Sequence, residues 1–225
     1  MSFTNVKVTE YIDSHYVPVD EDMKYLREVN EEKGIPLILR ETEGFLSFLL
    51  ELLQPKIILE IGTAYGYSAL FFAKKLPSAR ITTIDRAEKM INVAASNFED
   101  RPEGERIDFR IGNADEVLDE MISEHRSGGF VHEALFDFIF IDAGKSHYKE
   151  FFDRAEQLAK PGAVIVCDNI LMHGWTVDRS YEGAKRHRTN VKYMRQFIDY
   201  INEREDLTVS LLSSGDGLAV IRLHE

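Results

Sequence analysis

The chain is most informative at Leu59-Glu60-Ile61-Gly62-Thr63-Ala64-Tyr65-Gly66-Tyr67-Ser68, where an apolar run precedes two glycines and the start of a helical pattern. Glycines let a backbone approach a ligand closely, and the first turn of a helix offers free N–H groups. A dinucleotide-binding fingerprint would have a third, central glycine, which this stretch lacks. The carboxylate of Glu60 would also repel phosphate groups. The pattern therefore favours a cationic ligand over a pyrophosphate.

From residue 56 onward, short β-rich runs alternate with segments of helical period. This alternation is typical of βαβ units and a mostly parallel sheet. The last two β-rich runs are separated only by residues 213–217, and such a loop joins antiparallel strands. Pro161-Gly162 predicts a turn before the fifth strand. We expect strands over residues 56–61, 80–84, 107–111, 136–141, 163–167, 207–212 and 218–223, and helices over 68–75, 87–98, 114–125, 148–159 and 182–202.

The first fifty residues carry helical periodicity without strand signals, and Gly34-Ile35-Pro36 divides them into two parts. We expect a single domain over residues 1–225, with residues 1–50 as a helical segment packed on it, because α/β domains commonly reach this length. The arrangement resembles the Rossmann-like class I methyltransferase fold. That resemblance implies an α/β three-layer sandwich around a seven-stranded, mostly parallel sheet with an antiparallel C-terminal strand.

Composition excludes several classes of protein. The formal net charge of −12 disfavours a protein that coats nucleic acid, although it leaves room for a local basic patch such as Lys185-Arg186-His187-Arg188. The single cysteine, Cys167, rules out a disulfide within the chain. No apolar run approaches the roughly 18 residues that span a bilayer, and the N-terminus lacks the pattern of a secretory signal. We therefore expect a cytoplasmic protein that does not bind membranes.

S-adenosylmethionine (SAM) meets the requirement for a cationic ligand, because it carries a sulfonium and an ammonium group. Asp85, at the end of the second expected strand, is placed to accept hydrogen bonds from two ribose hydroxyls. Gly112-Asn113-Ala114 would border the adenine. Each feature also has a purely structural alternative: an ordinary turn for the glycines, and helix caps for Asp85 and Asp115.

Two aspartates stand just past the ends of two apolar runs. Asp142 follows residues 138–141, and Asp168, together with Asn169, follows residues 164–167. If these runs are neighbouring parallel strands, their carboxyl ends bring three oxygen ligands together. Oxygen-only ligation suits a hard cation such as Mg²⁺ and argues against zinc. The alternative is that both aspartates are helix N-caps.

Lys145 stands three residues beyond Asp142, so both side chains can face one cavity. A divalent cation lowers the pKa of a hydroxyl bound to it, and Lys145 could then remove the proton. The oxyanion would attack the methyl group in line. An isolated lysine is otherwise usually a solvated surface residue.

Five motifs, taken together, resemble those of the metal-dependent O-methyltransferases of the caffeoyl-CoA and catechol type. The resemblance spans nearly the whole chain from about Pro36. The motifs are Leu59 to Ser68; Ile107 to Arg110 with Gly112 and Ala114; Asp142 to Tyr148; Asp168 to Leu171 with Gly174; and Gly215 to Ala219.

This resemblance implies a role for each matching residue. It makes Asp142, Asp168 and Asn169 the ligands of Mg²⁺ or another hard divalent cation, with Lys145 as the catalytic base and Asp142 beside it. It also implies a homodimer. The positions that match cofactor contacts in the family are Glu60, Gly62, Ser68, Asp85, Ala114 and Asp142, with Ile38 near the methionine end.

Residues 185–188 and 215–220 look most like the bacterial tRNA 5-hydroxyuridine methyltransferases, which form 5-methoxyuridine at the wobble position. The 5-hydroxyl and 4-carbonyl of that base present two vicinal oxygens, as a catechol does. We therefore expect methylation of a tRNA anticodon loop. Two alternatives stay open: a small catechol or hydroxycinnamoyl-type substrate, and a non-enzymatic protein that binds SAM or a nucleotide on the same fold.

Two features bear on the acceptor. Trp175 stands where the family more often has a smaller apolar residue, and it would either stack on a base or phenolic ring or anchor its loop. In the helix expected over residues 182–202, Lys185, Arg188, Lys192 and Arg195 recur on one face. We expect Arg188 and Lys192 to contact tRNA phosphates, and the alternative is a solvated face.

Overall fold

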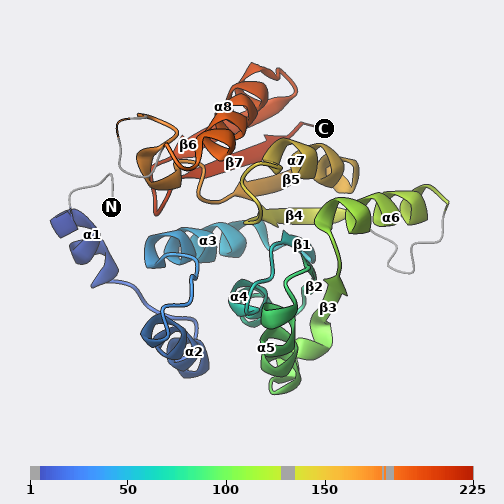
Figure 1. The fold of residues 1–225 in the computed structure, drawn as a ribbon. Helices are drawn as coiled ribbons and strands as arrows, with labels where there is room; N and C mark the ends of the chain where they lie inside the picture. The colour runs from blue at the N-terminus through green and yellow to red at the C-terminus, as the bar shows by residue number, and fades with distance from the viewer. Residues whose placement is uncertain (1–5, 128–134, 179, 181–184, 225) are drawn as a thin grey trace.

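The computed structural model describes residues 6–127, 135–178, 180 and 185–224. A seven-stranded sheet of order β3-β2-β1-β4-β5-β7-β6 forms its centre (Figure 1). β7 runs antiparallel to both of its neighbours, β5 and β6, and the other pairs are parallel. The strands are β1 (Ile57–Ile61), β2 (Arg80–Asp85), β3 (Ile107–Ile111), β4 (Phe136–Ile141), β5 (Ala159–Cys167), β6 (Leu207–Leu212) and β7 (Leu218–Leu223).

Helices cover both faces of this sheet, which completes the three-layer class I methyltransferase fold predicted from sequence. In Figure 1, α6, α7 and α8 lie on one side, and α3, α4 and α5 lie on the other together with the N-terminal α2. The helices are α1 (Val6–Asp13), α2 (Glu21–Glu32), α3 (Arg40–Leu53), α4 (Tyr67–Lys75), α5 (Glu88–Glu99), α6 (Ala114–Arg126), α7 (Tyr148–Gln157) and α8 (Arg188–Glu203), with short 3₁₀ turns η1 (Pro102–Arg106) and η2 (Met172–Gly174). No helix in the described ranges is long and apolar enough to cross a membrane.

The two faces of β1 explain why its sequence is an almost unbroken apolar run. Leu59 and Ile61 pack in the core beneath α6 and α7, while Ile58 packs in the second core beneath α4. A parallel strand buried on both faces has no polar side to offer. Glu60 alternates with these residues and shares the face of Ile58, so its carboxylate is enclosed by the protein.

The carboxyl ends of the central strands are held level with one another, which gathers the loops that follow them. The amide of Gly62 donates to the carbonyl of Ile84 over 3.0 Å, and the amide of Asp142 donates to the carbonyl of Ile61 over 2.9 Å. The amide of Asp168 donates to the carbonyl of Ile141 over 3.0 Å. The sequence motifs that follow β1, β2, β4 and β5 therefore meet along one edge of the sheet.

The predicted turn at Pro161-Gly162 is wrong as a boundary of the fifth strand. β5 begins at Ala159 and continues through both residues, with a shift in register between the pairs formed by Phe136 and Phe138. The extension arises because Phe136 already pairs with Ala159, and its amide donates to the carbonyl of Leu158 over 2.8 Å. The proline and glycine are accommodated in this irregular segment.

The C-terminal helix is shorter than predicted. α8 begins at Arg188, residues 182–184 lie outside the described residues, and Lys185 precedes the helix. Its buried face contains Val191, Met194 and Ile201, as expected from the periodicity.

Candidate active site

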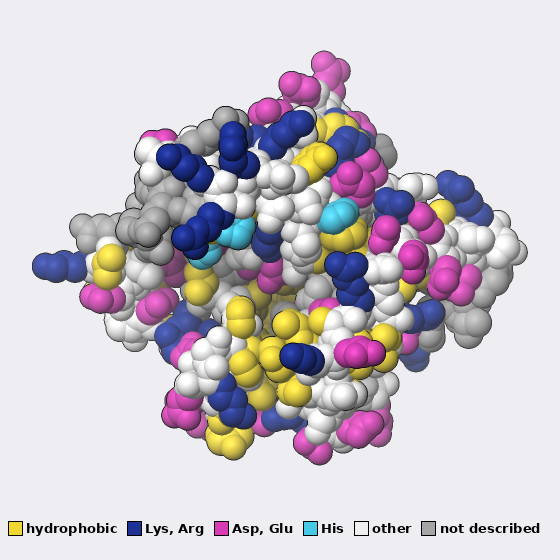
Figure 2. Space-filling view, in the orientation of Figure 1, with side chains coloured by type: hydrophobic (Ala, Val, Ile, Leu, Met, Phe, Trp, Pro, Cys, Tyr) yellow, Lys and Arg dark blue, Asp and Glu magenta, His cyan; other side chains and the backbone are white. Residues whose placement is uncertain are grey.

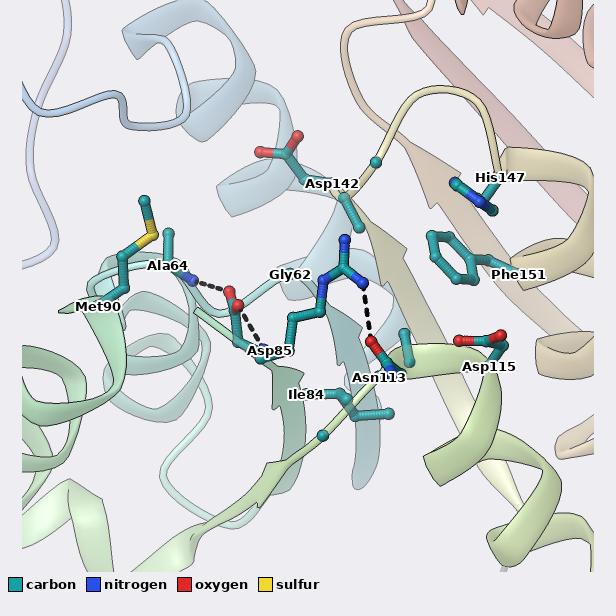
Figure 3. Close-up of a pocket in the computed structure, with 15 residues that line it drawn as sticks. Gly62, Ala64, Ile84, Asp85, Met90, Asn113, Asp115, Asp142, His147 and Phe151 are labelled. Atoms are coloured by element: carbon teal, nitrogen blue, oxygen red, sulfur yellow. Dashed lines mark hydrogen bonds between the residues drawn. The ribbon is translucent and has the colours of Figure 1, made fainter. Parts of the chain in front are cut away.

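A cavity of about 400 Å³ opens at the carboxyl ends of β1, β2 and β3 (Figure 3). In Figure 3, Asp142 lies across the cavity from Asp85, and Met90 and Phe151 lie at its two ends. Its size and place are those of a small-molecule pocket at the edge of an α/β sheet. Four of the residues predicted to contact the cofactor line this cavity: Gly62, Asp85, Ala114 and Asp142.

The turn after β1 can be built only with glycine at two positions. Gly62 and Gly66 have φ angles of +110° and +82°, a region in which side chains are strained. A Cβ atom at Gly66 would also lie 2.6 Å from the ring of Phe98. The turn therefore packs tightly against its surroundings while its backbone faces the cavity.

Asp85 is not the N-cap of α5, because Ala87 holds that position, and its predicted contact with a ribose stays a prediction. Its Oδ1 accepts from the amides of Arg86 and Ala87 over 2.7 and 3.0 Å, at the entry to α5, and its Oδ2 accepts from the amide of Ala64 over 2.8 Å. The side chain also lines the cavity, where it was expected to meet a ribose. Asp115 is not the N-cap of α6, because Asn113 holds that position and Asp115 lies in the first turn.

Glu60 and Ser68 do not line the cavity. Glu60 is fully buried; the hydroxyl of Thr83 donates to its Oε2, while its Oε1 has no hydrogen-bond partner among the described residues. Burial, together with the nearby negative charge of Asp142, raises the pKa of Glu60 to about 7 against the opposing hydrogen bonds from Ser68 and Thr83. A carboxyl group with a raised pKa is therefore enclosed at the end of β1, next to the glycine turn.

Ile38 is also away from the wall. Its side chain packs in the core between the N-terminal helices and the sheet, and its carbonyl accepts from Nη2 of Arg27 over 2.9 Å. The adjacent Leu37 and Leu39 line a second cavity instead. The predicted contact at Ile38 stays a prediction, and the structure places its neighbours nearer to the ligand space.

The second cavity, of about 830 Å³, adjoins the first, and Ala64, Met90 and Asp142 line both. Its other walls come from residues 27–39, from the loop after β5 and from the start of α8. In Figure 2 the surface is hollowed near the middle of this face, with histidine and basic side chains on the α8 side and hydrophobic side chains opposite. Asp142 thus stands between two adjoining ligand spaces.

Three predicted side chains converge at this edge. The Nζ of Lys145 donates to Oδ1 of Asp142 over 2.6 Å and to Oδ1 of Asn169 over 2.7 Å. It also donates over 2.8 Å to the hydroxyl of Tyr148, which in turn donates to the carbonyl oxygen of Asp168 over 2.7 Å. Tyr148, which sequence reasoning did not single out, therefore links the lysine to the end of β5.

Asp168 and Asn169 show signs of a site under constraint. Asp168 is 1% exposed, and its Oδ1 accepts a hydrogen bond from the amide of Asn169 over 2.6 Å. Burial raises the pKa of Asp168 to about 8; Asp142 acts in the same direction, and Lys145 opposes it. Asn169 has a φ angle of +57°, and such strained residues cluster at functional sites.

This donor set fits a hard divalent cation. Two carboxylates and an amide offer oxygen alone, and the ammonium of Lys145 already bridges Asp142 and Asn169 where a cation was expected. No group of three His, Cys, Asp or Glu side chains in the described ranges is arranged to hold a metal. A site here would therefore depend on the amide oxygen of Asn169 as its third protein ligand.

The larger cavity contains an aromatic stack that the sequence did not reveal. The rings of Trp175 and His187 lie 4.5 Å apart at 9°, and His173 meets Trp175 edge-on at 5.1 Å. All three line the second cavity. His187 stands inside a basic stretch, where no periodicity marks it as part of a wall.

The basic residues predicted on one face of α8 differ in their surroundings. Arg195 does not face solvent freely, because its guanidinium donates to the carbonyls of Thr176 and Val177 over 2.6 and 3.2 Å and so anchors the loop that carries Trp175. Arg188 and Lys192 are exposed and line neither cavity.

A buried network that sequence reasoning missed ties the N-terminal helices to the cofactor turn. Arg27 on α2 is 4% exposed, pairs with Glu43 on α3 and donates from Nε to the hydroxyl of Tyr67 over 3.1 Å. Tyr16 and Tyr67 donate to Glu43 over 2.6 and 2.8 Å. Tyr67 opens α4, directly after the glycine turn, so α2 and α3 support that turn.

Comparison with known proteins decides the family. A family model described as O-methyltransferase matches residues 13–224. The chain belongs to this O-methyltransferase family. The O-methyltransferase is 35% identical over 163 residues to a catechol O-methyltransferase of Niastella koreensis, which covers 69% of this chain and 71% of the relative. It is 33% identical over 209 residues to a caffeoyl-CoA O-methyltransferase of Medicago sativa, covering 90% and 81%.

Solved structures agree with this assignment. A candidate caffeoyl-CoA O-methyltransferase of Staphylococcus aureus superposes with a TM-score of 0.84 at 29% identity, covering 96% of this O-methyltransferase and 98% of that chain. An O-methyltransferase of Bacillus cereus in complex with SAH gives 0.79 at 28% identity, covering 96% and 97%. The protein is therefore a SAM-dependent O-methyltransferase of the caffeoyl-CoA and catechol type.

Proposed function

We propose that this O-methyltransferase methylates one of two vicinal oxygens on a small catechol or hydroxycinnamoyl-type acceptor, with the help of a hard divalent cation. One observation carries the proposal: Asp142 lies on the wall of both cavities, and Lys145 is bonded to it. A donor in the smaller cavity and an acceptor in the larger one would meet at this residue. The catechol and caffeoyl-CoA methyltransferases among its relatives support an acceptor of this class.

The chemistry follows from the residues at this edge. When bound, a cation held by Asp142, Asp168 and Asn169 would act as a Lewis acid on the acceptor hydroxyl, and SAM would supply an electrophilic methyl group. Lys145, as the neutral amine that remains after its ammonium has lost a proton to solvent, takes up the proton that the hydroxyl loses. The acceptor oxygen forms a bond to the methyl carbon as the carbon–sulfur bond breaks, leaving SAH.

The remaining residues orient and enclose the reactants. Gly62 and Asp85 shape the wall that faces the donor, and the buried carboxyl group of Glu60 lies below it as a source of negative charge. Trp175 and His187 offer flat faces to a planar acceptor ring. By holding the donor and acceptor against Asp142, these walls turn a bimolecular reaction into an effectively unimolecular one.

A specific observation favours a second candidate, 5-hydroxyuridine at the wobble position of tRNA. Lys185, Arg186, Arg188 and Lys192 are all exposed, and they follow or flank His187 on the rim of the acceptor cavity. Such a group would contact phosphates of an anticodon loop while its wobble base entered the cavity. The 5-hydroxyl and 4-carbonyl of that base are vicinal, so the same metal site would accept it.

The experiment that tests the activity is methyl transfer from labelled SAM with MgCl₂, offered to catechol, a caffeoyl thioester and tRNA from cells lacking this protein. Methylation of the small acceptors, lost with EDTA and restored by Mg²⁺, supports the first candidate. Conversion of 5-hydroxyuridine to 5-methoxyuridine, detected by nucleoside mass spectrometry, supports the second. A protein that binds SAM but methylates none of them, with or without metal, contradicts both.

A charge-reversal experiment separates the two acceptors. Arg188→Glu with Lys192→Glu should weaken tRNA binding and flatten its salt dependence, while leaving catechol turnover unchanged. Lys56→Glu is the matched control, because this exposed lysine lies before β1, at the opposite edge of the sheet. Equal losses of tRNA binding in both proteins would remove the support for the second candidate.

We also propose that two copies of the chain associate. Phe48 and Leu52 on α3 are 66% and 69% exposed, and Tyr11 on α1 is 68% exposed. Apolar side chains of this size gathered on the N-terminal helices favour a protein partner. Light scattering should give twice the monomer mass, and Phe48→Glu should halve it.

A further inference from the structure

The hydrogen bonds of Lys145 conflict with its proposed role as the base that takes up the acceptor's proton. An ammonium group has three N–H donors and no acceptor. Here the Nζ atom has three partners within 2.8 Å: Asp142, Asn169 and the hydroxyl of Tyr148. Every donor is used, and a saturated ammonium cannot accept a proton. In this arrangement the lysine is a counter-ion, so acting as a base requires another arrangement.

The same two oxygens that hold the ammonium are those expected to hold a metal. Asp142 has a second oxygen to offer, but Asn169 has only one side-chain oxygen, and Lys145 is bonded to it. A Mg²⁺ ion binds such an oxygen at ~2.1 Å. Sharing it would place a doubly charged and a singly charged cation roughly 4 Å apart. The two cations therefore compete for this oxygen.

The ammonium group of Lys145 borders open space into which it can move. The Lys145 side chain is 21% exposed, and it lines the larger cavity, in which the acceptor is expected. Its third partner, Tyr148, is 1% exposed and fixed by its bond to the carbonyl of Asp168. Tyr148 can thus keep one bond to the lysine while the other two are broken.

We propose that Lys145 and the divalent cation exchange places on Asp142 and Asn169. Without metal, the ammonium neutralises the cluster of Asp142, Asp168 and Asn169 and keeps it assembled. When the ion binds, it displaces the ammonium, which swings about Tyr148 to the acceptor. Lys145 is therefore free to face the acceptor only in the metal-loaded protein, and it takes up the acceptor's proton there after losing one of its own to solvent. This inference rests on the proposed metal-dependent function and adds an order to it: metal before proton transfer.

The exchange makes metal binding depend on the lysine in a measurable way. Lys145→Met removes the competing cation, so this variant should bind Mn²⁺ on the order of tenfold more tightly than the wild type, as expected for freeing oxygens from a charged hydrogen bond. The measurement is titration calorimetry on the full chain in the absence of SAM. Lys149→Met is the matched control, because Lys149 is exposed on the next turn and pairs with Asp153; its affinity should equal that of the wild type.

Thermal unfolding with and without MgCl₂ separates exchange from simple repulsion. If the ammonium is the counter-ion, metal-free Lys145→Met should unfold at a lower temperature than the metal-free wild type, and the loaded proteins should unfold at similar temperatures. A lysine that merely repels a nearby ion would give equal metal-free proteins and a more stable loaded variant, which overturns the exchange. Lys145→Gln, also neutral, serves if the methionine variant does not fold without metal.

The remaining outcomes are also decisive. An unchanged or weaker Mn²⁺ affinity in both Lys145 variants contradicts the exchange while leaving the proposed metal site intact. If the wild type and the variants all fail to bind Mn²⁺, the metal dependence of the proposed function fails, and the exchange fails with it. The two failures are therefore distinguishable by the wild-type titration alone.

Discussion

Gly62 and Asp142 are in backbone contact: a Cβ atom at position 62 would lie 2.1 Å from the carbonyl oxygen of Asp142. The turn that faces the donor and the residue between the two cavities are thereby fixed relative to each other. No side chain fits between them without moving the end of β4. This contact gives the first of four predictions.

Gly62→Ala should disrupt the site and the fold together. The strained φ angle and the collision with Asp142 should lower the free energy of unfolding by about 2–4 kcal/mol, and SAM affinity should fall by about tenfold or more. Urea unfolding and calorimetry measure the two effects. Gly44→Ala is the control, because nothing lies within 4 Å of a Cβ atom there and alanine favours α3. Similar behaviour of the two variants would contradict the assigned contact.

Glu60 should make stability and SAM binding depend on pH in opposite directions. Burial raises its pKa from 4.5 to about 7, so the folded protein retains a proton that the unfolded chain loses. The free energy of unfolding without cofactor should therefore fall between about pH 4.5 and 7, by on the order of 2–3 kcal/mol. SAM affinity should rise over the upper part of this range, because a cation favours the ionised carboxylate.

Glu60→Gln tests the predicted direction of both pH dependences, because a glutamine side chain cannot ionise. The variant should lose the part of the downward slope that Glu60 contributes, while the part contributed by Asp168, whose pKa is also raised, remains. Without cofactor it should be more stable than the wild type above pH 7, yet it should bind SAM more weakly. Parallel pH profiles of stability for the two proteins would show that Glu60 is not the group responsible.

Trp175 and His187 should affect binding of the acceptor and should not affect binding of SAM. Trp175→Ala removes one side of the stack and should raise KM for a planar acceptor by about tenfold, with KM for SAM unchanged because Trp175 does not line the smaller cavity. His187→Ala should have a smaller effect in the same direction. Arg188→Ala is the control with a small acceptor, because the side chain of Arg188 lies outside both cavities. If Arg188→Ala raised KM for the acceptor as much as Trp175→Ala does, Trp175 would not be a specific part of the acceptor wall.

Arg27→Met should destabilise the protein by about 3–5 kcal/mol, because it leaves the carboxylate of Glu43 buried without its cationic partner. Adding Glu43→Leu should recover most of this loss in urea unfolding. Arg40→Met is a milder comparison, because the ion pair of Arg40 with Glu31 is partly exposed. If the double variant were as unstable as Arg27→Met alone, the buried pairing would not be the cause.

Most of the fold could be predicted because the chain alternates between two clear periods. The almost unbroken apolar runs of β1 and β4 indicate buried strands, and the spacing of apolar residues in α6 and α7 indicates helices. The prediction failed where backbone pairing outweighs local preference, as at Pro161-Gly162, because Ala159 before them and Val164 after them both pair with β4. It also failed at the start of α8, where basic residues gave no boundary signal.

The site could be predicted only where its residues directly follow strands. Asp85, Asp142, Asp168 and Asn169 stand at strand ends, so sheet geometry alone brings them to one edge. Tyr148, His187 and Arg27 come from helices or their flanks, and their contacts depend on packing between elements far apart in sequence. Nothing in a linear pattern specifies such packing.

The walls of the two cavities are drawn from different parts of the chain. The smaller one is formed by residues 62–151, and the larger one takes most of its surface from residues 27–39 and 172–216. Under the proposed function, substitutions in the segments that line the larger cavity should change which molecule is methylated, while binding of the methyl donor stays the same. Exchange of these segments between relatives would then be a way to redirect acceptor choice in protein engineering.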